Sequence, residues 1–192
     1  MQLEENAGNV ALVCDGERTL GVRAAERLLL AEAVVNAAGP WAGRLEGVPD
    51  HVRLPIVPVK GQLLTLKMPR RLVVRVVAVP GAYLVPRPAD ETLVIGEAIE
   101  EDAFDDTVDA AAIERLRAAA VRAMPPLADL GPGDAWAGLR PRSPNRRPFV
   151  GPTALGGYFV AAGHEHNALL LAPATSLALA NVIEGKAPDA PQ

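Results

Sequence analysis

The segment Gly163–Ala168 separates a strand pattern, Tyr158–Ala162, from a long apolar helix pattern, and its residue types suit a planar or anionic ligand. Small residues at the end of the strand leave the backbone bare, so a ligand could approach the main chain closely. The following helix would present unpaired N–H groups and the positive end of its dipole at the same place. Such a helix start binds phosphate or stabilises negative charge on a cofactor ring. The alternative is an ordinary strand–turn–helix connection in which Asn167 caps the helix.

A second strand pattern, Glu32–Ala37, also ends in small residues, at Ala38 and Gly39. Its continuous apolar run is typical of a parallel strand that is covered on both faces. Open α/β sheets bind ligands at the carboxyl ends of their strands. Two bare strand ends in one sheet could therefore flank a single crevice.

Two further side chains are candidates for substrate binding. Arg140 lies between Leu139 and Pro141, and its guanidinium could hold a carboxylate through two parallel hydrogen bonds or form a structural ion pair. Tyr83 is either a buried aromatic residue with a satisfied hydroxyl group or a donor that faces the substrate. The residues by themselves leave both alternatives open.

Composition and spacing argue against several other classes of site. His164 and His166 lack the spacing of a helical metal pair, and Cys14 is the only cysteine, so we expect no metal site and no disulfide. A net charge of -4 without a basic stripe argues against nucleic acid as a partner. We expect a cytoplasmic protein with no membrane partner, because no signal pattern occurs and no apolar run approaches the length of a membrane span.

The order of the predicted elements indicates an α/β fold with an α+β insertion. Residues 54–68, 72–88 and 91–100 are β-branched and separated by turn residues, which predicts an antiparallel sheet. Residues 127–136 are expected to form a loop. The final strand and helix have no sheet of their own, so we expect them to return to the sheet that contains Glu32–Ala37.

One helix is predicted within the inserted region, from Asp106 to Met124. Either Thr107 or Asp109 can cap it, and Pro125 follows its end. Its apolar face is formed by residues at helical spacing, namely Ile113, Leu116, Ala120 and Met124. The last helix is predicted from Ala168 to Ile183.

Five ordered segments resemble the FAD-dependent D-amino-acid oxidase group, and in particular its glycine oxidase branch, which serves thiamine biosynthesis. The segments are VVNAAGPWAGRL, LPIVPVKGQLLTL, YLVPRPADETLVIGEA, WAGLRPRSPNRRPFVG and AAGHEHNALLLAPAT. The resemblance extends from about Val10 to Ile183. It implies a discontinuous Rossmann-like FAD domain with an inserted antiparallel substrate domain. Residues 1–47 would then be the last strands of the FAD-binding domain, residues 48–135 the substrate domain, and residues 136–192 the return to the FAD-binding domain.

The resemblance also implies an activity. With FAD as cofactor, a small amino acid or secondary amine would lose a hydride from Cα to the flavin, and water would hydrolyse the resulting imine. Oxygen would reoxidise the flavin and yield peroxide. No protein base is essential to this scheme, so the protein would mainly orient the substrate and supply electrostatic stabilisation.

The resemblance further assigns the site residues. Arg140 would hold the substrate carboxylate, assisted by Tyr83, with His166 in the position of a second arginine. The residues implied to contact the flavin are Gly39, Gly163, His164, Glu165, His166, Asn167, Ala168, Leu169 and Leu170.

Two departures concern the site itself. The family pattern Gly-His-aromatic-Arg-Asn-Gly reads GHEHNA here, from Gly163 to Ala168. His166 exchanges a permanent charge for a group that titrates near neutrality, so we expect weaker, pH-dependent carboxylate binding or a different amine substrate. Glu165 adds an adjacent negative charge. The segment SPNRRP replaces an Asp-Gly turn, and its local loop is expected to differ.

The third departure is the largest, because the family's Gly-x-Gly-x-x-Gly unit, which holds the ADP half of FAD, does not occur in the sequence. We therefore expect the chain alone to bind FAD poorly and to be a fragment, a truncated product or one half of a split enzyme with a separate N-terminal FAD-binding half. The alternatives are a non-catalytic remnant or binding module of the same fold, and a relative that uses another electron acceptor. The sequence leaves open whether the chain forms a homo-oligomer.

Overall fold

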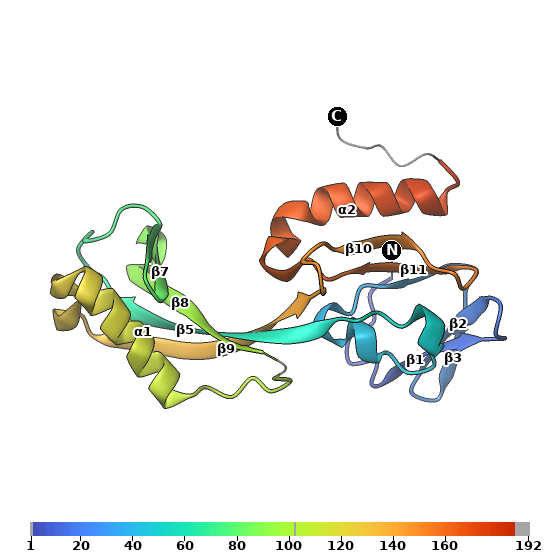
Figure 1. Cartoon of the computed structure of the whole chain (residues 1–192), viewed down its shortest axis with the longest axis horizontal. Helices are drawn as coiled ribbons and strands as arrows, with labels where there is room; N and C mark the ends of the chain where they lie inside the picture. The colour runs from blue at the N-terminus through green and yellow to red at the C-terminus, as the bar shows by residue number, and fades with distance from the viewer. Residues whose placement is uncertain (1, 102, 187–192) are drawn as a thin grey trace. The chain divides into compact units, whose positions relative to one another are not determined.

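The computed structural model describes residues 2–101 and 103–186, and the chain divides into two compact units. Unit 1 combines Met1–Val57 with Arg140–Gln192, whereas unit 2 is the continuous segment Pro58–Leu139 (Figure 1). One unit is thus inserted between two parts of the other, as the element order predicts. That unit 1 binds FAD and unit 2 binds substrate remains a prediction.

Unit 1 contains two three-stranded sheets. The first is antiparallel and consists of β1 (Val10–Cys14), β2 (Thr19–Ala24) and β3 (Arg27–Leu30). The second has the order β10 (Phe149–Pro152), β11 (Tyr158–Ala162) and β4 (Val34–Asn36). β11 pairs in parallel with β4, with Val160 opposite Asn36, which confirms the predicted return of the last strand.

Helix α2 (Ala168–Ile183) lies along β10 and β11 in Figure 1 and has the predicted bounds. Strand β4 is shorter than the predicted Glu32–Ala37. The prediction that β4 is covered on both faces is wrong, because Val35 is 40% exposed. The segment after β4 forms a 3-10 helix, η1 (Gly39–Arg44), with Pro40 in its first turn, where the missing proline N–H costs nothing. A second such turn is η2 (Asp50–Val52).

Unit 2 is built on a five-stranded sheet with the order β6-β7-β8-β5-β9. The pairs β6–β7, β7–β8 and β8–β5 are antiparallel, as predicted. The strands are β5 (Val57–Lys67), β6 (Val77–Val79), β7 (Ala82–Arg87), β8 (Thr92–Glu101) and β9 (Pro132–Arg142), with η3 (Pro88–Asp90) between β7 and β8.

The prediction of a loop at residues 127–136 is wrong. The segment forms η4 (Pro125–Asp129) and then enters β9. Residues 131–134 form hydrogen bonds with the edge of β5. The Lys67 N–H donates to the Gly131 carbonyl oxygen at 3.0 Å, and the Asp134 N–H donates to Thr65 Oγ1 at 2.8 Å. Pairing with an open strand edge thus overrides the turn-forming composition of this segment.

Helix α1 (Ala110–Ala123) covers one face of the unit 2 sheet. It is shorter than predicted at both ends, and Asp109 is its cap, since its carboxylate accepts from the N–H groups of Ala111 and Ala112 at 2.9 and 3.2 Å. Leu116 and Ala120 are buried in the core below it. Around them pack other buried apolar residues of the sheet and helix: Leu64, Leu66, Ala82, Leu84, Leu93, Ile95 and Ala119.

Replacing the cap, Asp109→Ala, is expected to lower the free energy of unfolding by about 1 kcal/mol, because two helical N–H groups lose their acceptor. Urea denaturation followed by far-UV circular dichroism measures the change. Asp129→Ala removes an exposed carboxylate that caps no α-helix and serves as the control. Equal losses in the two variants would contradict the capping role.

Candidate functional site

The connection from β11 to α2 begins at a position that accepts only glycine. Gly163 has φ +84, and a Cβ built there would lie 3.0 Å from Ile56 Cδ1 and 3.2 Å from Ser143 Cβ. A side chain would therefore be strained by its backbone and crowded by its neighbours. Gly163 therefore leaves no side chain on the backbone between the end of β11 and the turn η5 (Glu165–Asn167).

The start of α2 lacks a side-chain cap. Asn167 occupies the N-cap position, yet its side chain accepts no capping hydrogen bond from the described helix. Leu169 and Leu170 in the first turn are 93% and 79% exposed. The simple connection capped by Asn167 is therefore not what the structure contains. Neither η5 nor α2 has a side-chain cap, so no described side chain occupies the N–H groups where this helical segment begins, and they could face an anionic group.

His164 is the one turn residue whose ring is anchored on α2 by a described hydrogen bond. Its Nε2 lies 2.9 Å from Thr175 Oγ1. Burial of the ring lowers the pKa of His164 from its ordinary value of 6.5. The neutral imidazole is thus the favoured form in the folded chain.

This lowered pKa predicts a pH dependence of stability. The unfolded chain binds the proton more readily than the folded chain, so the contribution of His164 is complete above pH 6.5 and is lost as the pH falls below that value. His164→Gln is expected to flatten the fall in melting temperature between about pH 7 and pH 5. Thermal unfolding across this range measures it, with the exposed His51→Gln as control. An unchanged slope in His164→Gln would contradict the assignment.

Glu165 does not contribute the free negative charge that the sequence suggests. Its Oε1 accepts a hydrogen bond from Arg142 Nε at 3.2 Å, and the two side chains are 10% and 14% exposed. Arg142 also forms a β-bridge with His164. The sequence analysis did not identify Arg142 as a site residue, although it stands only two positions after Arg140.

Arg140 lies on β9 in unit 1 and forms no ion pair with any residue that the structure describes. The alternative of a structural ion pair is therefore unsupported. Successive side chains of a strand alternate between its faces, so Arg140 and Arg142 share one face of β9. The bridge between Arg142 and His164 places this end of β9 beside the turn.

The other two predicted substrate residues are exposed. Tyr83 lies on β7 in unit 2 and is 45% exposed, so it is not a buried aromatic residue. His166 lies in η5 in unit 1 and is also exposed. Neither side chain has a hydrogen-bond partner within residues 2–101 and 103–186.

The second bare strand end is fixed by a buried asparagine. Asn36 Nδ2 donates to the Ala42 carbonyl oxygen at 2.9 Å and to the Tyr158 hydroxyl oxygen at 2.8 Å. Its Oδ1 accepts from the Ala38 N–H at 3.1 Å. Burial raises the pKa of Tyr158, which keeps its hydroxyl group neutral. Gly39, with φ +55, follows directly and starts η1. This network fixes the carboxyl end of β4 against the side chain of Tyr158, the first residue of β11.

The SPNRRP segment forms its own turn. Buried Ser143 donates through Oγ to the Arg147 carbonyl oxygen at 2.6 Å, and Asn145 Oδ1 accepts from the Arg147 N–H at 3.1 Å. Arg146 has φ +58. These side chains supply the bonds that hold this turn in the sequence found here.

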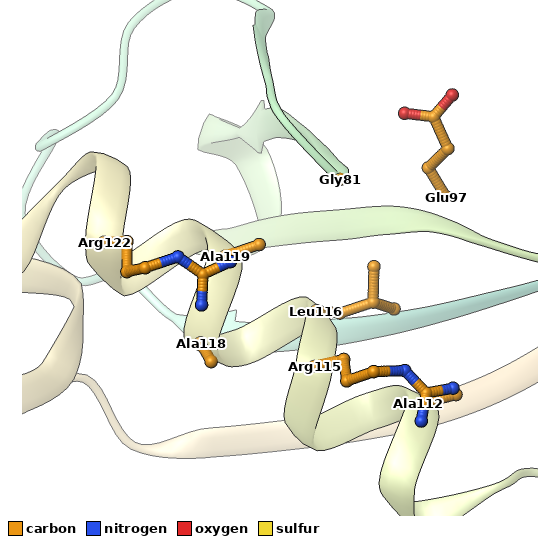
Figure 2. A pocket seen from close by; sticks show the side chains of 8 residues that line it. All are labelled: Gly81, Glu97, Ala112, Arg115, Leu116, Ala118, Ala119 and Arg122. Atoms are coloured by element: carbon orange, nitrogen blue, oxygen red, sulfur yellow. The ribbon is translucent and has the colours of Figure 1, made fainter.

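A cavity of about 430 Å³ in unit 2 contains none of the predicted site residues. It lies at α1, which contributes Arg115 and Arg122, and Glu97 stands on the sheet side (Figure 2). The described residues include no group of three His, Cys, Asp or Glu side chains placed to hold a metal ion. The predicted site residues Gly163–Leu170 lie at the β11–α2 turn, whereas Tyr83 lies in unit 2 and Gly39 starts η1.

The parallel pair β4–β11, with α2 following β11, is an arrangement of open α/β sheets, which bind ligands at the carboxyl ends of their strands. The chain belongs to the DAO family of FAD-dependent oxidoreductases, which matches residues 2–182. It is 38% identical to glycine oxidase from Pseudomonas aeruginosa over 189 residues, covering 98% of this chain and 51% of the relative. It is 34% identical to the hydrogen cyanide synthase subunit HcnC of Pseudomonas protegens, covering 95% of this chain and 44% of the relative.

A solved structure, glycine oxidase from Geobacillus kaustophilus, superposes with a TM-score of 0.83 at 32% identity, covering 92% of this chain and 47% of that chain. These matches confirm the predicted family and fold. The chain spans about half of the length of the curated relatives it matches.

The expectation that no apolar run approaches the length of a membrane span is wrong. The segment Glu165–Ile183 has 19 residues and is, by length and composition, apolar enough to cross a membrane, and 6% of it is buried. A core helix of a soluble protein passes the same test when it is covered. The segment contains the whole of α2, whose outward side is apolar.

Proposed function

We propose that this chain is the substrate-binding and flavin-facing part of an FAD-dependent oxidase of a small amino acid or secondary amine. The observation that carries the proposal is the turn at Gly163, where a crowded glycine, an uncapped helix start and the Arg140 end of β9 occur together. The family match and the 38% identity to a glycine oxidase support it.

These residues fit FAD. Gly39 and the turn Gly163–Asn167 would lie against the flavin, and the first turn of α2, with Leu169 and Leu170, would place its N–H groups near the pyrimidine end of the ring. When bound, FAD accepts the hydride that leaves the substrate Cα. The backbone N–H groups at the helix start stabilise negative charge there without having to reorient.

The chain's own side chains orient the substrate. Arg140 binds the substrate carboxylate through its planar guanidinium. The family resemblance assigns Tyr83 of unit 2 as a further substrate-binding residue. His166 provides a third group, an imidazole that can form a hydrogen bond to the substrate. Fixing the carboxylate fixes the Cα–H bond, and such positioning supplies a large part of the rate enhancement.

We further propose that the ADP half of FAD is bound by a segment outside this sequence, either in the same protein or in a separate chain. The support is the relatives' greater length and the apolar outward side of α2, since a helix that is apolar all round is normally covered. Strand β4 also ends its sheet with an open edge. One relative, HcnC, is itself named as a subunit of a synthase.

Absorbance between 350 and 500 nm, recorded with added FAD, tests the proposal. The chain alone is expected to bind FAD weakly and to show little activity. Mixed or fused with the first half of Pseudomonas aeruginosa glycine oxidase, it should retain yellow flavin and release peroxide from an amino-acid substrate. Stoichiometric flavin in the chain alone would contradict the need for a second segment. No flavin and no turnover in either form would support the non-catalytic alternative.

The second candidate function is a non-catalytic binding module of the same fold. His166 favours it, because the family pattern has a permanently charged arginine at this position. A screen of amino acids and secondary amines on the assembled protein separates the two. Oxygen as the electron acceptor is proposed from the family alone, and peroxide release tests it. The cytoplasmic location stays a prediction.

A further inference from the structure

The Arg142–Glu165 ion pair is the one described charge pair of the β11–α2 turn, and both of its side chains are largely withdrawn from solvent. Desolvated ion pairs cost free energy to form, so they are weak evidence for a purely stabilising role. The pair also joins segments 23 residues apart, β9 and the turn.

Glu165 adopts an unusual backbone conformation. Its φ of +50 lies in the left-handed region, which is unfavourable for a glutamate. Such a conformation persists only where surrounding contacts determine it. Arg142 makes two contacts with this part of the turn: its Nε donates to Glu165 Oε1, and its backbone forms a β-bridge with the adjacent residue His164.

We propose that Arg142 is a positioning residue, which holds the turn Gly163–Asn167 in shape so that the start of α2 meets the flavin. The pair also neutralises Glu165, so that its charge does not oppose a substrate carboxylate at Arg140. This inference rests on the proposed function, since it names a residue that shapes the same site. Arg142 touches neither substrate nor cofactor in this scheme.

The test uses the chain together with the FAD-binding half, and two readouts, amide hydrogen exchange and FAD titration. Arg142→Met leaves Glu165 without this partner and is expected to speed exchange in the peptide covering residues 163–170, and to raise the Kd for FAD about tenfold. The double variant Arg142→Met with Glu165→Gln removes both charges. It should regain the melting temperature of the unmodified chain but keep the fast exchange and the weak FAD binding.

Arg27→Met is the matched control, because it breaks an ion pair with Glu4 in the same unit where both side chains are solvent-accessible. It should change neither readout in the turn. A double variant that regains slow exchange and the original FAD affinity would show that the pair is only structural and would overturn the proposal. Unchanged exchange in Arg142→Met would do the same.

The two claims fail in different ways. If the unmodified chain shows no saturable FAD binding, even with a FAD-binding half present, the proposed function fails. The exchange pattern of the turn still decides whether Arg142 holds its shape.

Discussion

Arg140→Met is expected to lower kcat/KM for the amino-acid substrate by at least about 100-fold in the protein assembled with a FAD-binding half, because truncating one partner of a hydrogen-bonded charge pair costs about 2–5 kcal/mol. Met keeps the apolar stem of the side chain and removes the guanidinium. The loss should be mainly in KM if Arg140 binds the carboxylate equally in the ground state and the transition state.

Steady-state peroxide release measures this effect, and FAD retention at 450 nm checks that the cofactor site is intact. Arg23→Met, on β2 of the same unit, removes an exposed guanidinium and serves as the control. A kcat/KM within a few-fold of the unmodified protein would exclude Arg140 as the carboxylate ligand. An amine without a carboxylate should be insensitive to the substitution.

His166→Arg should act in the opposite direction and lower KM for a carboxylate substrate about tenfold, because a hydrogen bond to a charged group contributes about 1.5–3 kcal/mol. A guanidinium stays charged and can hold a carboxylate through two parallel hydrogen bonds, whereas an imidazole cannot make this paired contact.

KM measured at several pH values, with the proposed partner half present, checks this second prediction. His51→Arg adds the same charge at an exposed position of unit 1 and should leave KM unchanged. If His166→Arg does not alter KM at any pH, His166 does not contact the carboxylate. The substrate would then be sought among amines that need a single anionic anchor.

The elements of unit 1 that carry the site were predictable because their signals are local and strong. Tyr158–Ala162 is an apolar run and Ala168–Ile183 a predominantly apolar one, and the structure gives both segments the predicted bounds. The return of β11 to β4 followed from the lack of any other sheet for it to join. The family segments then supplied the roles of the site residues, which remain predictions.

Pairing between distant segments was not predictable in the same way. β9 starts in a Gly-Pro-Gly-Asp composition that is typical of a loop, and it becomes a strand because β5 offers acceptors and donors along its edge. The Arg142–Glu165 contact joins residues whose proximity depends on the whole fold. The sequence shows the negative charge of Glu165 beside the expected flavin contacts, but it does not show that Arg142 pairs with that charge.

The outward side of α2 has a consequence for the cell that makes this chain. With Leu169, Leu170 and Leu177 left in water, newly made copies would be substrates for chaperones and quality-control proteases until something sequesters that surface. If the proposed FAD-binding segment is a separate chain, abundance of this chain should then track the supply of that partner, and overproduction without it should yield inclusion bodies.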